Sequence, residues 1–354
     1  MVFNSIKPAQ VRRVALVYTG GTIGMMQHSP QEPLQPVDFQ NLQNKIPEIS
    51  RFDCAIIPYE FQKIDSSNIT LAIWEDLATL IGGLYETYDA FVILHGSDTM
   101  AFTASALSFM LEGLAKPIII TGSQLPIGEI RTDARENLLT AIEIATYSEY
   151  ILPEVAILFD NKLYRGNRTL KFSSEKFHAF DSPNYPLLAE AGVHISYYCQ
   201  NWLPIPQGTG FEVFAKLSPR IGLVKFYPGI SPHFLKAALD PEYFDGVVLE
   251  TFGTGNLPTF PWLLNLLRES ANAGTILLSV TQCPGGKVEQ GRYETSRSLL
   301  DIGIISGFDM TREAALTKLM YLFAKYSNTQ LIRDLLQHNL RGELSVEKTA
   351  IFDY

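Results

Sequence analysis

The sequence has few of the features that mark secreted or membrane-spanning proteins. Its 354 residues include three cysteines (Cys54, Cys199 and Cys283), with no C-x-x-C spacing. Three cysteines cannot all pair within one chain, so the composition favours a reducing, cytoplasmic location. No apolar run approaches the length of a membrane span, and Met1–Gln10 lacks the apolar core of a signal peptide. We therefore expect neither a membrane partner nor a signal peptide.

Positive charge is also scarce. The chain has 28 Lys and Arg against 37 Asp and Glu, a formal net charge of −9 and a pI of about 5.2. This balance argues against a general nucleic-acid partner, because binding of phosphates needs a basic surface. The six histidines show no metal-ligand spacing, so no metal site is expected.

What the chain does have is a repeated alternation of strands and helices. With 46% apolar residues it can form a large core, and its length suggests two domains. Alternating elements predict α/β domains with mostly parallel sheets and right-handed crossovers. We expect a larger N-terminal catalytic domain over 1–199, a linker rich in proline and glycine over 200–220, and a smaller C-terminal domain over 221–354. The strands expected in the first domain are Val14–Tyr18, Ala55–Tyr59, Ala90–Leu94, Pro117–Thr121 and Val155–Phe159.

The first expected strand ends in an unusual glycine turn. Val14–Tyr18 is a continuous apolar run, typical of a strand covered on both faces, and Gly20-Gly21-Thr22 follows it. Thr22 would then lie at the carboxyl edge of the sheet, where open α/β sheets place their ligands. The motif lacks the spacing of a dinucleotide or phosphate loop. Two interpretations stay open at this point, a plain tight turn and a site with Thr22 as nucleophile.

Two further hydroxyl-bearing loops follow expected strands, at Ser97 and Ser123. Parallel strands end at one edge, so these loops should converge with Thr22. Taken alone, Ser97-Asp98-Thr99 is better read as helix capping, and Ser66-Ser67 likewise. Lys171 alone would be a solvated surface lysine.

Four motifs along the chain resemble those of the bacterial L-asparaginase family, and the resemblance covers nearly the whole sequence. They are Tyr18–Gly24 (YTGGTIG), His95–Met100 (HGSDTM), Ile120–Gln124 (ITGSQ) and Leu163–Thr169 (LYRGNRT). The further segments Ala101–Leu111 and Asn339–Leu344 are most similar to the type I, cytoplasmic branch.

The resemblance implies a cofactor-free amidohydrolase that converts L-asparagine to L-aspartate and ammonia, assembled as a homodimer or homotetramer. It implies Thr22 as nucleophile and a second catalytic cluster of Ser97, Asp98 and Lys171. Ser66, with Ser67 beside it, would hold the α-carboxylate of the substrate, and Asp98 the α-amino group. Asn256 would reach the site of a neighbouring subunit.

The sequence departs from the family pattern in three places. Ser97 stands where a threonine is usual, which keeps the hydroxyl and removes a methyl group. No tyrosine lies between Thr22 and Pro36, although many family members have one in this loop, which we expect to be mobile. Glu250 and Leu170 stand where a regulatory asparagine pocket would need other residues, so we expect weak or absent allosteric activation.

Other functions stay open beside asparagine hydrolysis. Glutaminase activity differs by one methylene of substrate, worth only about 1–3 kcal/mol of discrimination, and a lysophospholipase-type side activity is also conceivable. A non-catalytic amino-acid or nucleotide binding module would need no spare nucleophile. An amidotransferase subunit acting on transfer RNA fits poorly with the negative net charge.

Overall fold

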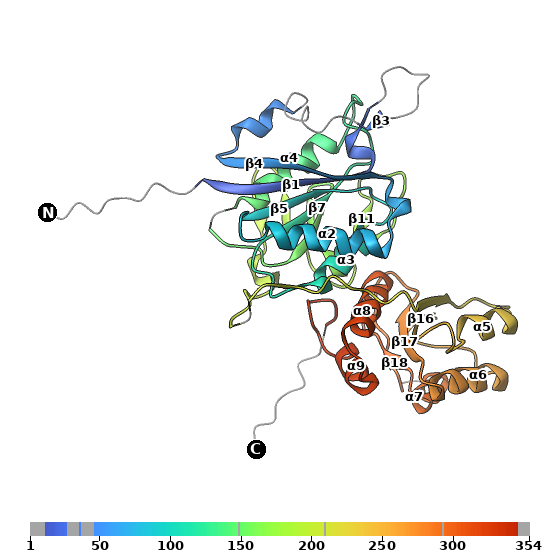
Figure 1. Cartoon of the computed structure of the whole chain (residues 1–354). Coiled ribbons are helices and arrows are strands. Elements are labelled where there is room, and N and C mark those ends of the chain that lie inside the picture. The colour runs from blue at the N-terminus through green and yellow to red at the C-terminus, as the bar shows by residue number, and fades with distance from the viewer. Residues whose placement is uncertain are drawn as a thin grey trace.

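The computed structural model describes residues 11–26, 35–36, 46–147, 149–208, 210–291 and 294–345. Figure 1 shows a larger lobe, coloured blue to yellow, and a smaller lobe, coloured yellow to red. Each lobe contains its own largely parallel sheet, so the expected α/β class is confirmed.

The strands of the larger lobe include five close to those expected from the sequence. They are β1 (Arg12–Gly20), β2 (Met25–Met26), β3 (Gln35–Pro36), β4 (Cys54–Ile64), β5 (Ala90–Leu94), β6 (Leu111–Glu112), β7 (Ile118–Thr121), β8 (Val155–Phe159), β9 (Lys162–Arg165), β10 (Leu170–Lys171), β11 (Phe180–Asp181), β12 (Ala189–Ala191), β13 (Ile195–Tyr197) and β14 (Glu212–Val213). Its helices and 3-10 turns are η1 (Thr22–Gly24), η3 (Pro47–Arg51), η4 (Ser66–Asn68), α2 (Leu71–Leu84), α3 (Met100–Met110), α4 (Ala134–Ala145), η5 (Gly166–Arg168) and η6 (Cys199–Asn201).

The smaller lobe alternates strand and helix in the same way. Its elements are β15 (Ile221–Lys225), α5 (Pro232–Ala238), β16 (Gly246–Thr251), α6 (Pro261–Asn272), β17 (Ile276–Thr281), α7 (Glu294–Ile302), β18 (Ile305–Ser306), α8 (Arg312–Lys325) and α9 (Thr329–Leu336). All pairs in its sheet, ordered β15-β16-β17-β18, are parallel.

The main sheet of the larger lobe has the order β13-β12-β9-β8-β7-β5-β1-β4. Strands β4, β1, β5, β7 and β8 are parallel, whereas β9 turns back antiparallel to β8. That reversal uses the two-residue turn Asp160-Asn161, whose φ angles are 49° and 63°. Asp and Asn tolerate this left-handed conformation better than other side chains, which makes them suited to a tight hairpin turn. The sequence analysis did not predict β9 as a strand.

The register aligns the strand ends that matter for a site. Tyr18 of β1 pairs with Leu94 of β5, and Leu94 pairs with Thr121 of β7. The loops that carry Thr22, Ser97 and Ser123 therefore leave the sheet at one edge. Convergence of these three loops, expected from the sequence, is present in the structure.

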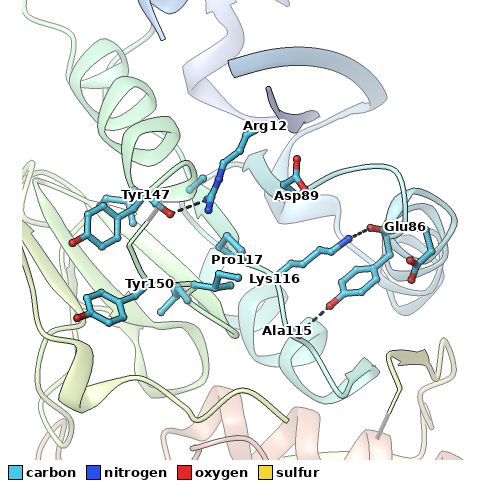
Figure 2. A pocket seen from close by; sticks show the side chains of 13 residues that line it. Arg12, Glu86, Asp89, Ala115, Lys116, Pro117, Tyr147 and Tyr150 are labelled. Atoms are coloured by element: carbon cyan, nitrogen blue, oxygen red, sulfur yellow. Dashed lines mark hydrogen bonds between the residues drawn. The ribbon is translucent and has the colours of Figure 1, made fainter. Parts of the chain in front are cut away.

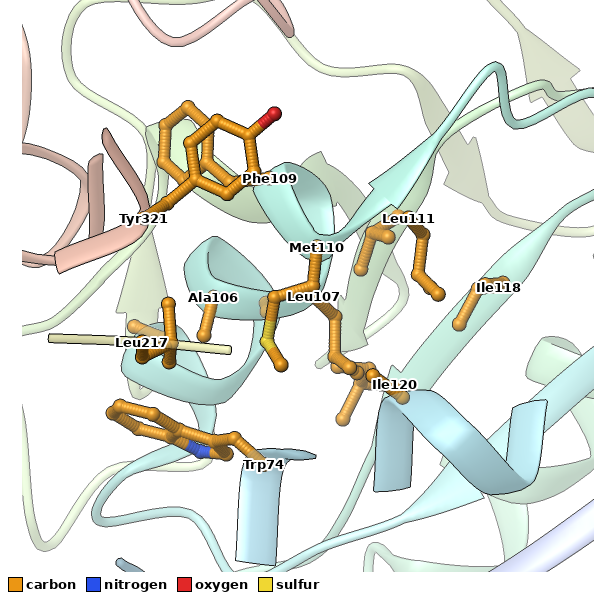
Figure 3. Close-up of a cluster of buried hydrophobic side chains, with 14 of the residues drawn as sticks. Trp74, Ala106, Leu107, Phe109, Met110, Leu111, Ile118, Ile120, Leu217 and Tyr321 are labelled. Carbon is orange, nitrogen blue, oxygen red and sulfur yellow. The ribbon is translucent and has the colours of Figure 1, made fainter. Parts of the chain in front are cut away.

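Helix α3 joins this edge to the smaller lobe. All of its residues except Phe102 are buried, and its closest helical neighbour is α8 of the smaller lobe. The rings of Phe109 on α3 and Tyr321 on α8 stack with centroids 6.0 Å apart. Figure 3 shows this contact in a hydrophobic cluster that also contains Trp74 and Leu217 and spans both lobes. Packing of α3 on α8 thus holds the helix that directly follows the Ser97 loop.

The expected linker region lies against the larger lobe. Strand β14 pairs antiparallel with β6, and Phe211 stacks on Tyr85 with ring centroids 3.5 Å apart. In the described part of the chain, no helix is both long and apolar enough to cross a membrane.

Candidate active site

Thr22 lies in a tight 3-10 turn directly after β1. The turn is closed by Gly24 N donating to Gly21 O over 3.3 Å, and the Thr22 side chain is half-buried. The ring of Tyr18 occupies the space where a side chain on Gly24 would lie. Burial, aided by Glu60, raises the pKa of Tyr18 to about 12, so its phenol is neutral at ordinary pH. Residues 27–34, most of the loop expected to be mobile, lie outside the described residues.

The two glycine turns touch through their main chains. Gly20 and Gly21 have φ angles of 112° and 84°, which other residues adopt only with strain. A Cβ on Gly21 would overlap Gly96 N and Cα, and a Cβ on Gly20 would overlap Ile64. Absence of side chains at these positions lets the Thr22 turn pack directly on the loop that carries Ser97.

Ser97, Asp98 and Thr99 do not cap helix α3. Thr99 occupies the N-cap position but makes no side-chain cap bond. Its hydroxyl instead donates to Ser66 O over 2.8 Å, and this contact ties η4 to the Ser97 loop. The capping interpretation, preferred for this tripeptide taken alone, is therefore wrong. The sequence itself argues against capping as the role of all three residues, because a helix needs only one N-cap residue.

The side chains of Ser97 and Asp98 meet Lys171. Lys171 Nζ donates to Ser97 Oγ over 2.8 Å and to Asp98 Oδ1 over 2.7 Å. The lysine side chain is 17% exposed and the Asp98 side chain 64% exposed, so the carboxylate faces solvent beside a largely covered amine. Lys171 lies 74 positions after Ser97 and 73 after Asp98 in the chain, and the fold brings the three side chains into one cluster. Lys171 is not the solvated surface lysine that its residue type alone would suggest.

Ser66 and Ser67 have different surroundings. Ser66 is 4% exposed, and its hydroxyl lies against Gly96, next to Ser97. Ser67 is exposed, and its hydroxyl donates to Asp65 Oδ1 over 2.8 Å. The Ser67 N–H donates to the same oxygen, and this bond holds the pKa of Asp65 below its usual value. Ser66 therefore belongs to the cluster, and Ser67 chiefly closes the η4 turn, whose N-cap is Asp65.

His95 is buried and supports the Ser97 loop from behind. Its Nδ1 lies 2.7 Å from Gly96 O, and its Nε2 lies 2.9 Å from the hydroxyl of Thr103. Because the Gly96 carbonyl can only accept, the histidine proton is on Nδ1, and Nε2 accepts from the Thr103 hydroxyl. Trp74 Nε1 donates to that same hydroxyl over 2.9 Å. Burial lowers the pKa of His95 to about 4, which keeps the ring neutral. His95 is therefore a buried structural histidine whose two ring nitrogens both have hydrogen-bond partners.

This arrangement orients a main-chain donor. In a planar trans peptide the C=O and the next N–H point in opposite directions. Because Gly96 O faces His95, the Ser97 N–H points away from the histidine. It donates to no acceptor within the described ranges of the chain. A donor fixed in this way is suited to stabilise an oxyanion.

Asn256 lies in the smaller lobe, shortly after β16. It closes a turn after β16, in which Asn256 N donates to Phe252 O over 2.8 Å and Phe252 N to Asn256 O over 3.0 Å. Its expected reach toward a neighbouring subunit stays a prediction.

A cavity of about 310 Å³ lies at the opposite edge of the main sheet (Figure 2). It is lined by Arg12, at the start of β1, and by Asp89 and Pro117, which directly precede β5 and β7. Arg12 Nη1 donates to Tyr147 O over 2.8 Å across it. Since the Thr22 and Ser97 loops leave the other ends of these strands, this cavity is separate from the candidate site.

Comparisons with known proteins show which family the sequence and fold resemble. Two family models match, "Asparaginase, N-terminal" over residues 13–203 and "Glutaminase/Asparaginase C-terminal domain" over residues 220–336. L-asparaginase 1 of Escherichia coli is 44% identical, covering 95% of this chain and 99% of that protein. The mouse 60 kDa lysophospholipase is 39% identical, covering 96% of this chain and 64% of its own. The crystal structure of L-asparaginase I from Vibrio cholerae superposes with a TM-score of 0.86 at 40% identity, covering 95% of this chain and all of that one.

Fold, site and matches together define the class as that of the amidohydrolases. Within that class, the chain belongs to the L-asparaginase family.

Proposed function

We propose that this chain hydrolyses L-asparagine to L-aspartate and ammonia, with Thr22 as the first nucleophile. The observation that carries the proposal is the Lys171 amine, 2.8 Å from Ser97 Oγ and 2.7 Å from Asp98 Oδ1. Ser97, Asp98 and Lys171 bring a hydroxyl, a carboxylate and an amine together, next to the turn that carries the Thr22 hydroxyl. Such a set can supply both a nucleophile and a base. A module that only binds amino acids has no use for that combination.

The reaction divides into two steps. Thr22 Oγ1 bonds to the side-chain amide carbon of asparagine, the C–N bond breaks, and ammonia leaves with the hydroxyl proton. Water then attacks the resulting ester, releasing aspartate and restoring the threonine hydroxyl. Each step passes through a tetrahedral oxyanion, for which the N–H groups of Thr22 and Ser97 are the proposed donors. One such donor is typically worth about 3–4 kcal/mol.

Lys171 acts in this scheme as the base, together with Ser97. An amine accepts a proton only when it is neutral, and a neighbouring carboxylate favours its charged form. We propose that the α-ammonium group of the substrate takes over Asp98 on binding, which weakens the hold of Asp98 on the Lys171 proton. Asp98 suits that role because a carboxylate is a pure acceptor, and Ser66 is placed to receive the α-carboxylate.

The proposal extends to assembly and location. We propose a homodimer or homotetramer in which Asn256 completes the site of a neighbouring subunit. We also propose a cytoplasmic location, in keeping with three cysteines that are all free thiols.

Ammonia release from a panel of substrates tests the activity. We expect turnover with L-asparagine, less with L-glutamine, and no fatty-acid release from a lysophospholipid. Equal rates with asparagine and glutamine would revise the substrate, and lysophospholipid hydrolysis without ammonia release would overturn the proposal.

A further inference from the structure

Lys171 has little support from the strand that carries it. Strand β10 has two residues and, among the residues that the structure describes, pairs only with β11, through Leu170–Asp181 and Lys171–Phe180. Two-stranded ribbons are marginally stable on their own. The position of the amine must therefore be fixed by other contacts of the same segment.

Arg168, three residues earlier in η5, makes such contacts. It is 1% exposed and donates to both carboxylate oxygens of Asp309, over 3.0 and 2.6 Å. It also donates to Glu343 O over 2.7 Å, to Asn184 O over 2.8 Å and to Ser345 Oγ over 3.1 Å. The planar guanidinium presents its donors in a fixed fork, so partners on several sides leave it one orientation. Asp309, Glu343 and Ser345 all belong to the C-terminal part of the chain.

Two neighbouring side chains reach the same C-terminal segment. Asn167 is fully buried and its Nδ2 donates to Arg341 O over 2.8 Å. Arg165 Nη1 donates to Gly342 O over 3.4 Å. Gly342 has a φ of 81°, and a Cβ there would overlap the Arg165 guanidinium. Three side chains of the Lys171 segment thus donate hydrogen bonds to one short stretch, Asn339–Ser345.

That stretch is itself held by an ion pair in the protein interior. Glu343 and Lys318 are both completely buried, with Oε1 and Nζ 2.6 Å apart. The Glu343 carboxylate also accepts from Leu340 N and Arg341 N, over 3.0 and 2.6 Å. Removing either member of such a pair would leave an uncompensated buried charge, so the geometry is strongly held.

Lys318 lies on α8, the helix that packs against α3. Helix α3 begins two residues after Asp98. Lys171 follows the segment that is hydrogen-bonded to Asn339–Ser345. Helix α8 therefore connects both halves of the Lys171–Asp98 pair.

We propose that Asn339–Ser345 and Asp309 form a positioning element for Lys171, acting through Arg168. The smaller lobe would then contribute to the chemistry of the same chain's own site, besides any contribution to a neighbouring subunit. This inference rests on the role proposed above for Lys171. Because a displacement of about 1 Å can cost on the order of a hundredfold in rate, loosening the element should lower kcat. KM should change little, since the proposed substrate contacts are made by Ser66 and Asp98.

Asp309→Asn is the principal test, because it keeps the shape of the side chain and removes its charge. Ser345→Ala is a milder second variant that removes one acceptor of Arg168. Asp245→Asn is the matched control, since Asp245 also pairs with an arginine of the smaller lobe, Arg220, over 3.0 Å. Steady-state kinetics with L-asparagine are measured from pH 5 to 9, together with melting temperatures and the Lys171→Met variant.

For Asp309→Asn we expect kcat to fall about tenfold to a hundredfold, with KM within about threefold. The acidic limb of its kcat profile should shift, because the surroundings of the Lys171 amine change. Ser345→Ala should show the same shift with a fall in kcat of about threefold, which keeps the inference testable if Asp309→Asn fails to fold. The control should match the wild type.

The proposal is overturned if folded Asp309→Asn and Ser345→Ala keep the wild-type kcat and pH profile while Lys171→Met is inactive. It is also overturned if both variants have a lower melting temperature but unchanged kcat and pH profile. Near-normal turnover by Lys171→Met is a different result, since it would remove the role proposed for the lysine itself.

Discussion

The two sides of the candidate site are held in different ways. Thr22 and Ser97 are placed by main chain, at the ends of two adjacent buried strands whose glycine turns touch at Gly21 and Gly96. Lys171 is placed by side chains, through an arginine whose partners lie up to 177 positions away in the sequence. Main-chain placement follows from strand register. Side-chain placement depends on residues far apart in the sequence, and it can be loosened one contact at a time.

The contrast is sharpest at Lys171 itself. Replacing it by methionine keeps an unbranched side chain, one heavy atom shorter, and removes the amine that donates to Ser97 and Asp98. We expect kcat with L-asparagine to fall about a thousandfold, within the range for loss of a general base. Ammonia release under saturating substrate measures this.

Lys236→Met is the control for that variant, since Lys236 is an exposed lysine on α5 of the smaller lobe. Near-normal turnover by Lys171→Met would contradict the proposed role of Lys171, because the amine would then not be needed as a base.

The main-chain half is tested at Gly21. Alanine there would be strained at a φ of 84° and would overlap the backbone of Gly96. We expect kcat to fall about a hundredfold from displacement of the turns, with a lower melting temperature. Gly83→Ala is the matched control, because Gly83 lies in helix α2 with nothing within 4 Å of a new Cβ. That substitution should raise stability by about 0.5–1 kcal/mol, and wild-type activity in Gly21→Ala would contradict the account.

His95 gives the main-chain half a pH dependence. Its pKa is lowered from 6.5 to about 4 by burial, whereas the unfolded chain protonates it near 6.5. The unfolded state therefore binds more protons between these values, and stability falls as the pH drops. Between pH 7.5 and 5.0 this costs about 2 kcal/mol.

Urea unfolding of the wild type and His95→Asn at the two pH values measures this difference. The gap between the two proteins should shrink by about that 2 kcal/mol at pH 5.0. A constant gap would show that the histidine is not held neutral.

The smallest effect is expected at Ser97. Threonine there keeps the hydroxyl that Lys171 contacts and adds one methyl group, which restricts the side-chain rotamer. We expect kcat to stay within about threefold of the wild type, since neither hydroxyl nor N–H is lost. A loss as large as that of Ser97→Ala would mean that the loop has no room for the methyl group.

The same contrast explains what the sequence could predict. Apolar runs such as Ala90–Leu94 mark buried strands directly, and parallel strands bring the loops after them to one edge. The contacts of Arg168 follow no local pattern, because they depend on how the two lobes pack. The prediction that Ser97-Asp98-Thr99 caps a helix was wrong for the same reason, since its partners, Lys171 and Ser66, lie in other segments.

Ammonia release by Thr22→Ala tests whether Thr22 is the nucleophile. With L-asparagine we expect a rate below about a thousandth of the wild type, while the melting temperature is unchanged. Thr22→Ser should retain measurable turnover because it keeps the hydroxyl. Equal ammonia release by Thr22→Ala and the wild type would contradict the account.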